Sequence, residues 1–478
     1  MKLRSGFAAA AALCLASTGA FGSPAAPGKA SFTVPVEYHK LDNGLRVVLS
    51  KDSTAPKAIV AVYYNIGFRI EPRDRTGFAH LFEHMMFQGS ENLGKMEFIK
   101  LVQSNGGLLN GSTRFDFTNY FEIVPSNALE TALWAEADRM RGLAITQENL
   151  TNQQGVVKSE VRVNVLNRAY GGFPWLDMPQ YANTNWHNAH NFYGDLKDLD
   201  AATLADVDKF FKTYYVPSNA VLVVTGDFES APTLAKIKEL FGKIPSPPKP
   251  TLPDISEPKQ DKEKRATKDD KLATKPALAF GYHAPKPNTP EYYAMGLLEE
   301  ILLSGKDSRL YQALVQRAGL TGDVTGGINP GLGNMFNVYG PTLFVGSLFY
   351  DKDKSADQIL KVIDEEIDKL RNAPVDKATL DRALVKMRSS YYDTLEGFVG
   401  FGRADLLASF ALFYDNPDMI NHVEEQFRKV TPELLQKTAR EYLAPTNRTV
   451  LLIEPKAEAK PDAPKPAAPG GGPAGSSR

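Results

Sequence analysis

The string HLFEH occupies positions 80–84, inside a stretch whose pattern predicts a helix. Residues four apart on an α-helix are separated by roughly 40° of azimuth, so His80 and His84 project from one face. Two imidazoles on one face make half of a tetrahedral zinc site. Glu83 lies at the edge of that face, placed to take a proton from a water molecule whose pKa the metal lowers to about 7. These residue types and this spacing predict metal-assisted hydrolysis of an amide.

A third ligand must come from another element, because one helix face offers only two good positions. The segment GVVKSEV at 155–161 contains a candidate, Glu160, which follows His84 at a long distance along the chain. Glu160 belongs to a helical pattern that runs from about Gln147 to Arg168. A histidine pair on a helix is also a common packing or capping feature, so the third donor decides between the two interpretations. His187 and His190 form another close pair, but no carboxylate follows them at a convincing spacing.

The elements that must position these residues belong to a chain of 478 residues, enough for two or more domains. Residues 1–22 combine Lys2 and Arg4 with an apolar, alanine-rich run, the pattern of a secretory signal peptide rather than a membrane anchor. Cys14, the single cysteine, lies in this segment, so no thiolate would remain to bind metal. We therefore expect a secreted protein, periplasmic and without a stable membrane anchor.

Composition argues against nucleic acid as a partner. The net charge is −1, and loss of residues 1–22 with their two positive charges would bring it to about −3. No basic patch stands out along the chain, whereas nucleic-acid binding requires one.

A sequence repeat that matches Pro217 with Pro445 indicates duplicated domains. Each half closes with a helix end, a Pro-x-Asn turn at one of these prolines, and a β-rich run. Residues 56–61 and 275–280 likewise predict matching first strands. The offset between the two copies is too long for a solenoid repeat. The expected organisation is an N-terminal domain with the HLFEH string (32–245), a solvated linker (246–272), a homologous C-terminal domain (273–455) and a disordered Pro/Ala/Gly-rich tail (456–478).

Within each half, hairpin-like strands alternate irregularly with helices. This order predicts an α+β fold with two homologous domains rather than a doubly wound parallel sheet. In the first half, strands are predicted at 45–49 and 58–64 and within 108–124. Helices are predicted at 74–88, 96–104, 127–141 and 201–214.

The HLFEH string, the distant glutamate and the duplication together resemble the pitrilysin/insulinase family of zinc metallopeptidases, the inverzincins. The resemblance is strongest to bacterial members similar to mitochondrial processing peptidase, and it covers roughly residues 32–455. It implies domains that each carry a mixed or antiparallel sheet packed by helices. It also implies one zinc ion bound by His80, His84 and Glu160, with Glu83 as the general base.

The segment GGLLNGST at 106–113 resembles the family's edge strand, which pairs with an extended peptide substrate. Strand addition of this kind gives affinity through main-chain hydrogen bonds. By this resemblance Asn110 and Gly111 would bind substrate beside the scissile bond; the alternative is an ordinary glycine-rich strand entry. Gln153 stands where the family often has a second glutamate. Its amide can hydrogen-bond a ligand but adds no charge.

One departure from the family pattern concerns the second half. Active single-chain and homodimeric relatives grip the substrate backbone with an arginine and, seven residues on, a tyrosine. Val315 and Gly322 occupy those positions here, and neither side chain can donate a hydrogen bond. The resemblance therefore implies an endopeptidase for extended oligopeptides or unfolded segments, paired with a homologous zinc-free subunit that supplies the Arg/Tyr clamp.

Two alternatives remain open at this point. Another residue, such as Arg317, would replace the clamp without a partner. The chain would otherwise be a non-catalytic assembly or binding subunit of the same fold, although the complete set of His80, Glu83, His84 and Glu160 argues against that class.

Overall fold

The computed structural model describes residues 32–456. The expected signal peptide with Cys14, and the expected tail from residue 457 onward, lie outside the described residues. Of the helices within 32–456, none is long and apolar enough to cross a membrane.

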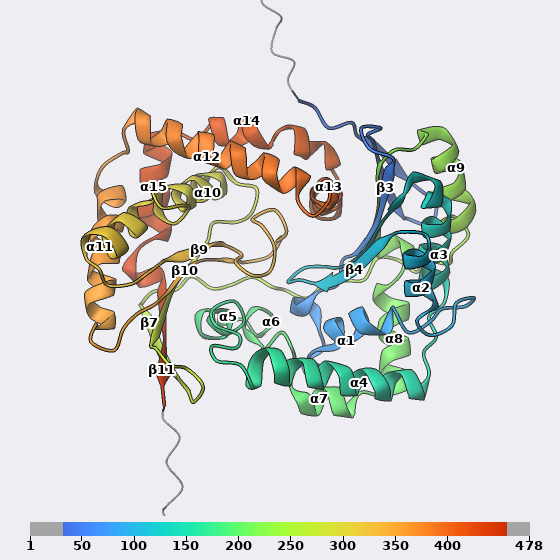
Figure 1. Ribbon diagram of the computed structural model, residues 1–478, viewed down its shortest axis with the longest axis horizontal. Coiled ribbons are helices and arrows are strands. Elements are labelled where there is room, and N and C mark those ends of the chain that lie inside the picture. The colour runs from blue at the N-terminus through green and yellow to red at the C-terminus, as the bar shows by residue number, and fades with distance from the viewer. Residues whose placement is uncertain (1–31, 457–478) are drawn as a thin grey trace, which may run out of the picture. The chain divides into compact units, whose positions relative to one another are not determined.

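The first half of the described chain builds a six-stranded sheet in the order β1-β2-β6-β3-β5-β4 (Figure 1). β2 and β6 are parallel, and the other neighbours are antiparallel. The strands are β1 (Glu37–Lys40), β2 (Arg46–Lys51), β3 (Lys57–Tyr64), β4 (Leu108–Thr113), β5 (Thr118–Pro125) and β6 (Ala220–Gly226).

The second half builds a five-stranded sheet in the order β7-β11-β8-β10-β9. Here β7 and β11 are the parallel pair, so the strand order matches that of the first sheet without β1. This common topology confirms the predicted α+β fold with two homologous, mixed sheets. The strands are β7 (Lys264–Asp270), β8 (Ala277–His283), β9 (Thr325–Ile328), β10 (Leu343–Phe349) and β11 (Arg448–Pro455).

β7 lies inside the segment 246–272 that the sequence predicts to be a linker, so that prediction is wrong for residues 264–270. β7 is the counterpart of β2. The predicted first strands at 56–61 and 275–280 correspond to β3 and β8, which match each other but are the second pair of matching strands. Its sequence, KRATKDD, is polar because β7 is an edge strand whose alternate residues are exposed. β2 is instead apolar and buried between β1 and β6. Residues 246–263, all of them described, form no helix or strand.

The described chain has fifteen α-helices, of which some pack on the two sheets and others on neighbouring helices. They are α1 (Phe78–Met85), α2 (Glu97–Ser104), α3 (Leu129–Arg141), α4 (Gln147–Val161), α5 (Asp177–Ala182), α6 (Trp186–Ala189), α7 (Leu196–Ala201), α8 (Leu204–Tyr214), α9 (Ser230–Phe241), α10 (Pro290–Leu302), α11 (Ala356–Asn372), α12 (Lys377–Glu396), α13 (Phe401–Tyr414), α14 (Val423–Arg428) and α15 (Pro432–Tyr442).

The Pro-x-Asn turns of the repeat perform the same task in both halves. The amide of Asn219 donates to the carbonyl of Tyr214, the last residue of α8, at 2.9 Å. The amide of Asn447 donates to the carbonyl of Tyr442, the last residue of α15, at 2.7 Å. Each asparagine thus satisfies a carbonyl that the end of a helix leaves without an intrahelical partner, which explains why the turn recurs in both copies.

Each half also contributes a helix to the sheet of the other half. α13 packs on β2, β3 and β6, whereas α5 packs on β8 and β11. In the alignment that matches Pro217 with Pro445, α5 falls on positions 405–410 within α13, so the exchange is reciprocal. It explains the nearly continuous apolar sequence of the central strands. Val47 belongs to the core that includes α1 residues, and its neighbour Val48 belongs to the core that includes α13 residues.

Candidate metal centre

The helix that carries the HLFEH string is fixed at its start. It begins at Phe78, after Gly77 adopts a left-handed φ of 83°. The carboxylate of Glu71 accepts the backbone N–H of Gly77 at 2.9 Å and that of Ala79 at 2.7 Å. Glu71 is 1% exposed, and Nε2 of His190 lies 3.3 Å from its Oε2. A buried carboxylate therefore faces the positive end of the helix dipole and holds α1 in place.

A second helix brings the distant glutamate to α1. Thr146 caps the start of α4, and its hydroxyl accepts the N–H of Asn149. It packs along α1, as Figure 1 shows. Glu160 lies one residue before the end of α4, and its side chain is partly buried against the two histidines.

The three donors converge. Nε2 of His80 lies 3.3 Å from Nε2 of His84. The carboxylate oxygens of Glu160 lie 3.2 Å from Nε2 of His84 and 3.6 Å from Nε2 of His80. Tetrahedral coordination with metal–ligand bonds of about 2.0–2.1 Å places donor atoms roughly 3.3 Å apart. The donor set and its spacing therefore fit a zinc ion, with a fourth position left for water or substrate.

The protonation states of the donors favour metal binding. Burial, together with the neighbouring His84, lowers the pKa of His80 to about 4. The hydrogen bond from His84 is the main cause that lowers the pKa of Glu160. At neutral pH the histidine is therefore neutral and the glutamate ionised, the forms that bind a metal.

Glu83 lies beside the donors and is held by the first sheet. The hydroxyl of Thr113 on β4 donates to Oε2 of Glu83 at 2.6 Å, which leaves Oε1 to receive a proton. Burial raises the pKa of Glu83, in the direction that makes a carboxylate a better base. A Cβ on Gly111 would lie 3.3 Å from Cγ of Glu83, so the glycine allows β4 to approach α1 this closely.

The predicted substrate strand is β4, an edge strand of the first sheet. Asn110 is exposed, and its side-chain oxygen accepts the N–H of Gly111 at 2.9 Å. On its outer side β4 pairs with no strand of residues 32–456. The strand therefore has a free edge beside Glu83, the arrangement that strand addition requires.

His80, His84 and Glu160 together form the donor cluster. Three other polar residues singled out in the sequence have their partners outside it. The amide of Gln153 donates to Asn152 at 2.8 Å, and no hydrogen bond within the described chain joins it to the three donors, unlike the expectation. Nδ1 of His187 lies 2.6 Å from the carbonyl oxygen of Arg69. His190 contacts Glu71 as described above. Over residues 32–456, the one convergent metal-ligating group is His80, His84 and Glu160.

The sequence does not assign a role to two residues at the centre, Thr113 and Tyr193. Thr113 lies two residues after Gly111, and the two-residue period of a strand could have placed both on the face toward Glu83. The hydroxyl of Tyr193 lies 3.5 Å from Oε1 of Glu160, and its ring meets that of His80 edge-on at 5.1 Å. Burial raises the pKa of Tyr193 to about 12. Nothing local in the sequence places it there.

In the second half, Val315 lies in a π-helix (Tyr311–Arg317) and is partly buried. Gly322 is exposed, and a Cβ there would meet no atom within 4 Å. Arg317, the alternative clamp residue, forms an ion pair with Glu366 of α11 at 2.5 Å.

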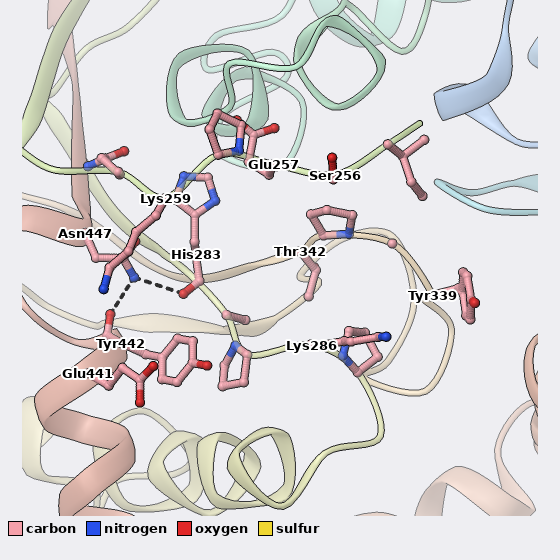
Figure 2. Close-up of a pocket in the computed structure, with 18 of the residues that line it drawn as sticks. Ser256, Glu257, Lys259, His283, Lys286, Tyr339, Thr342, Glu441, Tyr442 and Asn447 are labelled. Carbon is pink, nitrogen blue, oxygen red and sulfur yellow. Dashed lines mark hydrogen bonds between the residues drawn. The ribbon is translucent and has the colours of Figure 1, made fainter. Parts of the chain in front are cut away.

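A separate cavity has a volume of about 600 Å³ (Figure 2). Its lining comes from residues 254–260, the end of β8, residues 339–342 and the end of α15. Lys259 and Lys286 line it together with Glu257 and Glu441, so its charges are mixed. None of its described lining residues belongs to the donor cluster, so the cavity is separate from the candidate metal site.

Comparison with protein families agrees with this fold. Residues 46–182 match the model Insulinase (Peptidase family M16), and residues 201–387 match the model Peptidase M16 inactive domain. The chain belongs to peptidase family M16.

The chain is similar to several individual proteins. The zinc protease PqqE of Helicobacter pylori is 26% identical over 423 residues, which cover 87% of this chain and 92% of that protein. A probable mitochondrial-processing peptidase subunit beta of Arabidopsis thaliana is 25% identical over 214 residues, 44% of this chain and 39% of that protein. The crystal structure of a protease from Helicobacter pylori superimposes with a TM-score of 0.79 at 26% identity and covers 89% of this chain and 100% of that one.

Proposed function

We propose that this protein is a zinc endopeptidase that hydrolyses extended oligopeptides or unfolded segments. The observation that carries the proposal is the convergence of His80, His84 and Glu160 at zinc-like spacing with Glu83 beside them. The printed name of the Helicobacter pylori relative, zinc protease PqqE, supports the same metal.

In this proposal the two histidines and Glu160 hold one zinc ion. The chemistry that a bound zinc ion supplies is Lewis acidity, which polarises the scissile carbonyl and lowers the pKa of water. Glu83 takes the proton of the attacking water on Oε1, while Thr113 holds Oε2. The same carboxyl group then gives the proton to the leaving amine.

The substrate would add as a strand to β4, with Asn110 and Gly111 beside the scissile bond. The N–H of Gly111 now bonds the side chain of Asn110, which would turn away to free it. Because the interaction uses main-chain groups, it admits many sequences but requires an extended chain.

Glu83→Gln tests the proposal. The variant should retain zinc, because Glu83 is not a donor, while its kcat falls by about 10²–10⁴-fold through loss of the general base. Glu148→Gln, on the exposed first turn of α4, is a matched control that should behave as wild type. Turnover retained in Glu83→Gln would remove Glu83 from its role.

We also propose that the chain is the catalytic subunit of a heterodimer with a zinc-free homologue. Support comes from Val315 and Gly322 in place of the clamp and from the name of the plant relative, a subunit beta. Gly322 allows a direct test, because a Cβ added there would meet no atom within 4 Å.

The purified chain alone should hydrolyse unstructured peptides weakly, and the double variant Val315→Arg, Gly322→Tyr should raise its kcat/KM. Val385→Arg, on the exposed face of α12, adds the same charge elsewhere and should change nothing. Full activity of the wild-type chain without any partner would refute the heterodimer and favour a clamp built from other residues.

Elemental analysis of bound zinc distinguishes the peptidase from the second candidate, a non-catalytic assembly subunit. A zinc content near one per chain supports the peptidase, and zinc-free protein supports the subunit. We further propose export to the periplasm through residues 1–22, which cell fractionation checks.

A further inference from the structure

A short loop fixes Tyr193 against the start of the ligand helix. Gly77 and Gly194 both have left-handed φ angles, 83° and 80°. A Cβ added to Gly194 would lie 2.5 Å from the backbone nitrogen of Gly77, so the two glycines allow the backbones to touch. The backbone N–H of Asp195 donates to the hydroxyl of Thr76 at 2.8 Å. The backbone that follows Tyr193 is thereby tied to the two residues that precede α1.

The side chain of Tyr193 is held as well, with its hydroxyl at the donor cluster. Its ring lies edge-on to His80 at 5.1 Å and to Trp175 at 5.7 Å. The hydroxyl lies 3.5 Å from Oε1 of Glu160, the oxygen that lies 3.6 Å from Nε2 of His80. A separation of 3.5 Å is at the outer limit of a hydrogen bond. The Asn164 side chain also hydrogen-bonds this hydroxyl, and because that bond lowers the pKa of Tyr193, the amide is its donor. The phenol proton itself is therefore donated only over the long contact to Glu160 and is available to a better acceptor.

We propose that Tyr193 is a catalytic residue that donates a hydrogen bond to the oxygen of the scissile carbonyl as that oxygen gains negative charge. The inference rests on the proposed peptidase function. In the step, the water oxygen bonds to the carbonyl carbon, the water proton goes to Glu83, and the carbonyl π pair moves onto its oxygen. Tyr193 keeps its proton throughout and stabilises the new charge.

Two features suit Tyr193 to this task. A donor that is already in position costs no reorganisation when charge develops, and the fixed loop provides that condition. The first half of this chain also contains the whole donor cluster, whereas Val315 and Gly322 of the second half offer no side-chain donor. Tyr193 therefore stabilises the charge with or without a partner subunit.

Tyr193→Phe separates this role from a structural one. It removes only the hydroxyl, and Tyr181→Phe on the exposed side of α5 is the matched control. Three quantities are measured: kcat and KM on an unstructured peptide, zinc affinity by competition with a chelator, and inhibition by a phosphinic peptide, which carries tetrahedral oxygens in place of the scissile carbonyl.

The expected result is a fall in kcat of about 100-fold, the usual effect of one lost oxyanion donor. KM and zinc affinity should stay within about twofold, and inhibition by the phosphinic peptide should weaken by a factor similar to that in kcat. A kcat within threefold of wild type overturns the inference. So does a zinc affinity that falls tenfold or more, because the hydroxyl would then act by orienting Glu160.

The two proposals fail in different ways. A wild-type protein that binds zinc but hydrolyses no peptide removes the peptidase function and this inference together. An active wild type, inactive Glu83→Gln and fully active Tyr193→Phe remove the inference alone.

Discussion

The hydrogen bond between Thr113 and Glu83 gives a quantitative expectation for activity. Thr113 is 6% exposed, and its hydroxyl donates to Oε2 of Glu83 at 2.6 Å. Thr113→Val replaces this hydroxyl by a methyl group of similar size. The Glu83 carboxylate then loses a buried hydrogen-bond donor.

The magnitude follows from the charge on the acceptor. A hydrogen bond to a charged group contributes about 1.5–3 kcal/mol. Since about 1.4 kcal/mol corresponds to a factor of ten, kcat/KM should fall by about 10–150-fold. Most of the loss should appear in kcat, because Thr113 holds the base rather than the peptide. Thr113→Ser keeps the hydroxyl and should retain most of the activity.

The assay is steady-state hydrolysis of an unstructured peptide, with zinc content measured on the same samples. Thr438→Val is the matched control, because Thr438 is fully buried in α15 and its hydroxyl has no hydrogen-bond partner in the described chain. The reasoning is refuted if Thr113→Val keeps kcat/KM within threefold of wild type at full zinc occupancy. It is also refuted if Thr113→Ser loses as much activity as Thr113→Val.

Three further expectations concern stability. Zinc at 100 times its dissociation constant should stabilise the fold by about 2.7 kcal/mol, so chelation should lower the Tm in calorimetry, and an unchanged Tm would contradict metal binding. Burial raises the pKa of Glu299 to about 8, so between about pH 4.5 and 8 the folded chain holds a proton that the unfolded chain has lost, and stability falls as pH rises. Denaturant unfolding should show that Glu299→Gln removes this pH dependence, which changes the free energy of unfolding by at most about 5 kcal/mol. Parallel pH profiles of the wild type and the variant would exclude this effect of Glu299. Asp116 forms an ion pair with Arg69 at 2.9 Å, and Arg69 is 1% exposed. Asp116→Ala should lower the free energy of unfolding by about 3–5 kcal/mol, because it leaves the charge of Arg69 uncompensated. A decrease under about 1 kcal/mol would show that other groups compensate this charge.

The elements of the first half were predictable because their signals are local. The strand prediction at 58–64 corresponds to β3 (Lys57–Tyr64), and the helix prediction at 96–104 to α2 (Glu97–Ser104). The predicted helix at 74–88 is shorter, Phe78–Met85, because Gly77 in a left-handed conformation sets its start. β7 was not predicted from the sequence, because an edge strand needs few apolar residues.

The sequence by itself determined the spacing of His80, Glu83 and His84 on one helix and the duplication of the two halves, since both are written in short segments that can be compared directly. It also pointed to Glu160, through a resemblance rather than through geometry. Only the tertiary structure decided that Glu160 meets the histidines, that Thr113 holds Glu83, and that each half covers the sheet of the other. The reason is physical: these contacts join segments that are distant in the sequence, and packing of whole helices on sheets, not local propensity, brings such segments together.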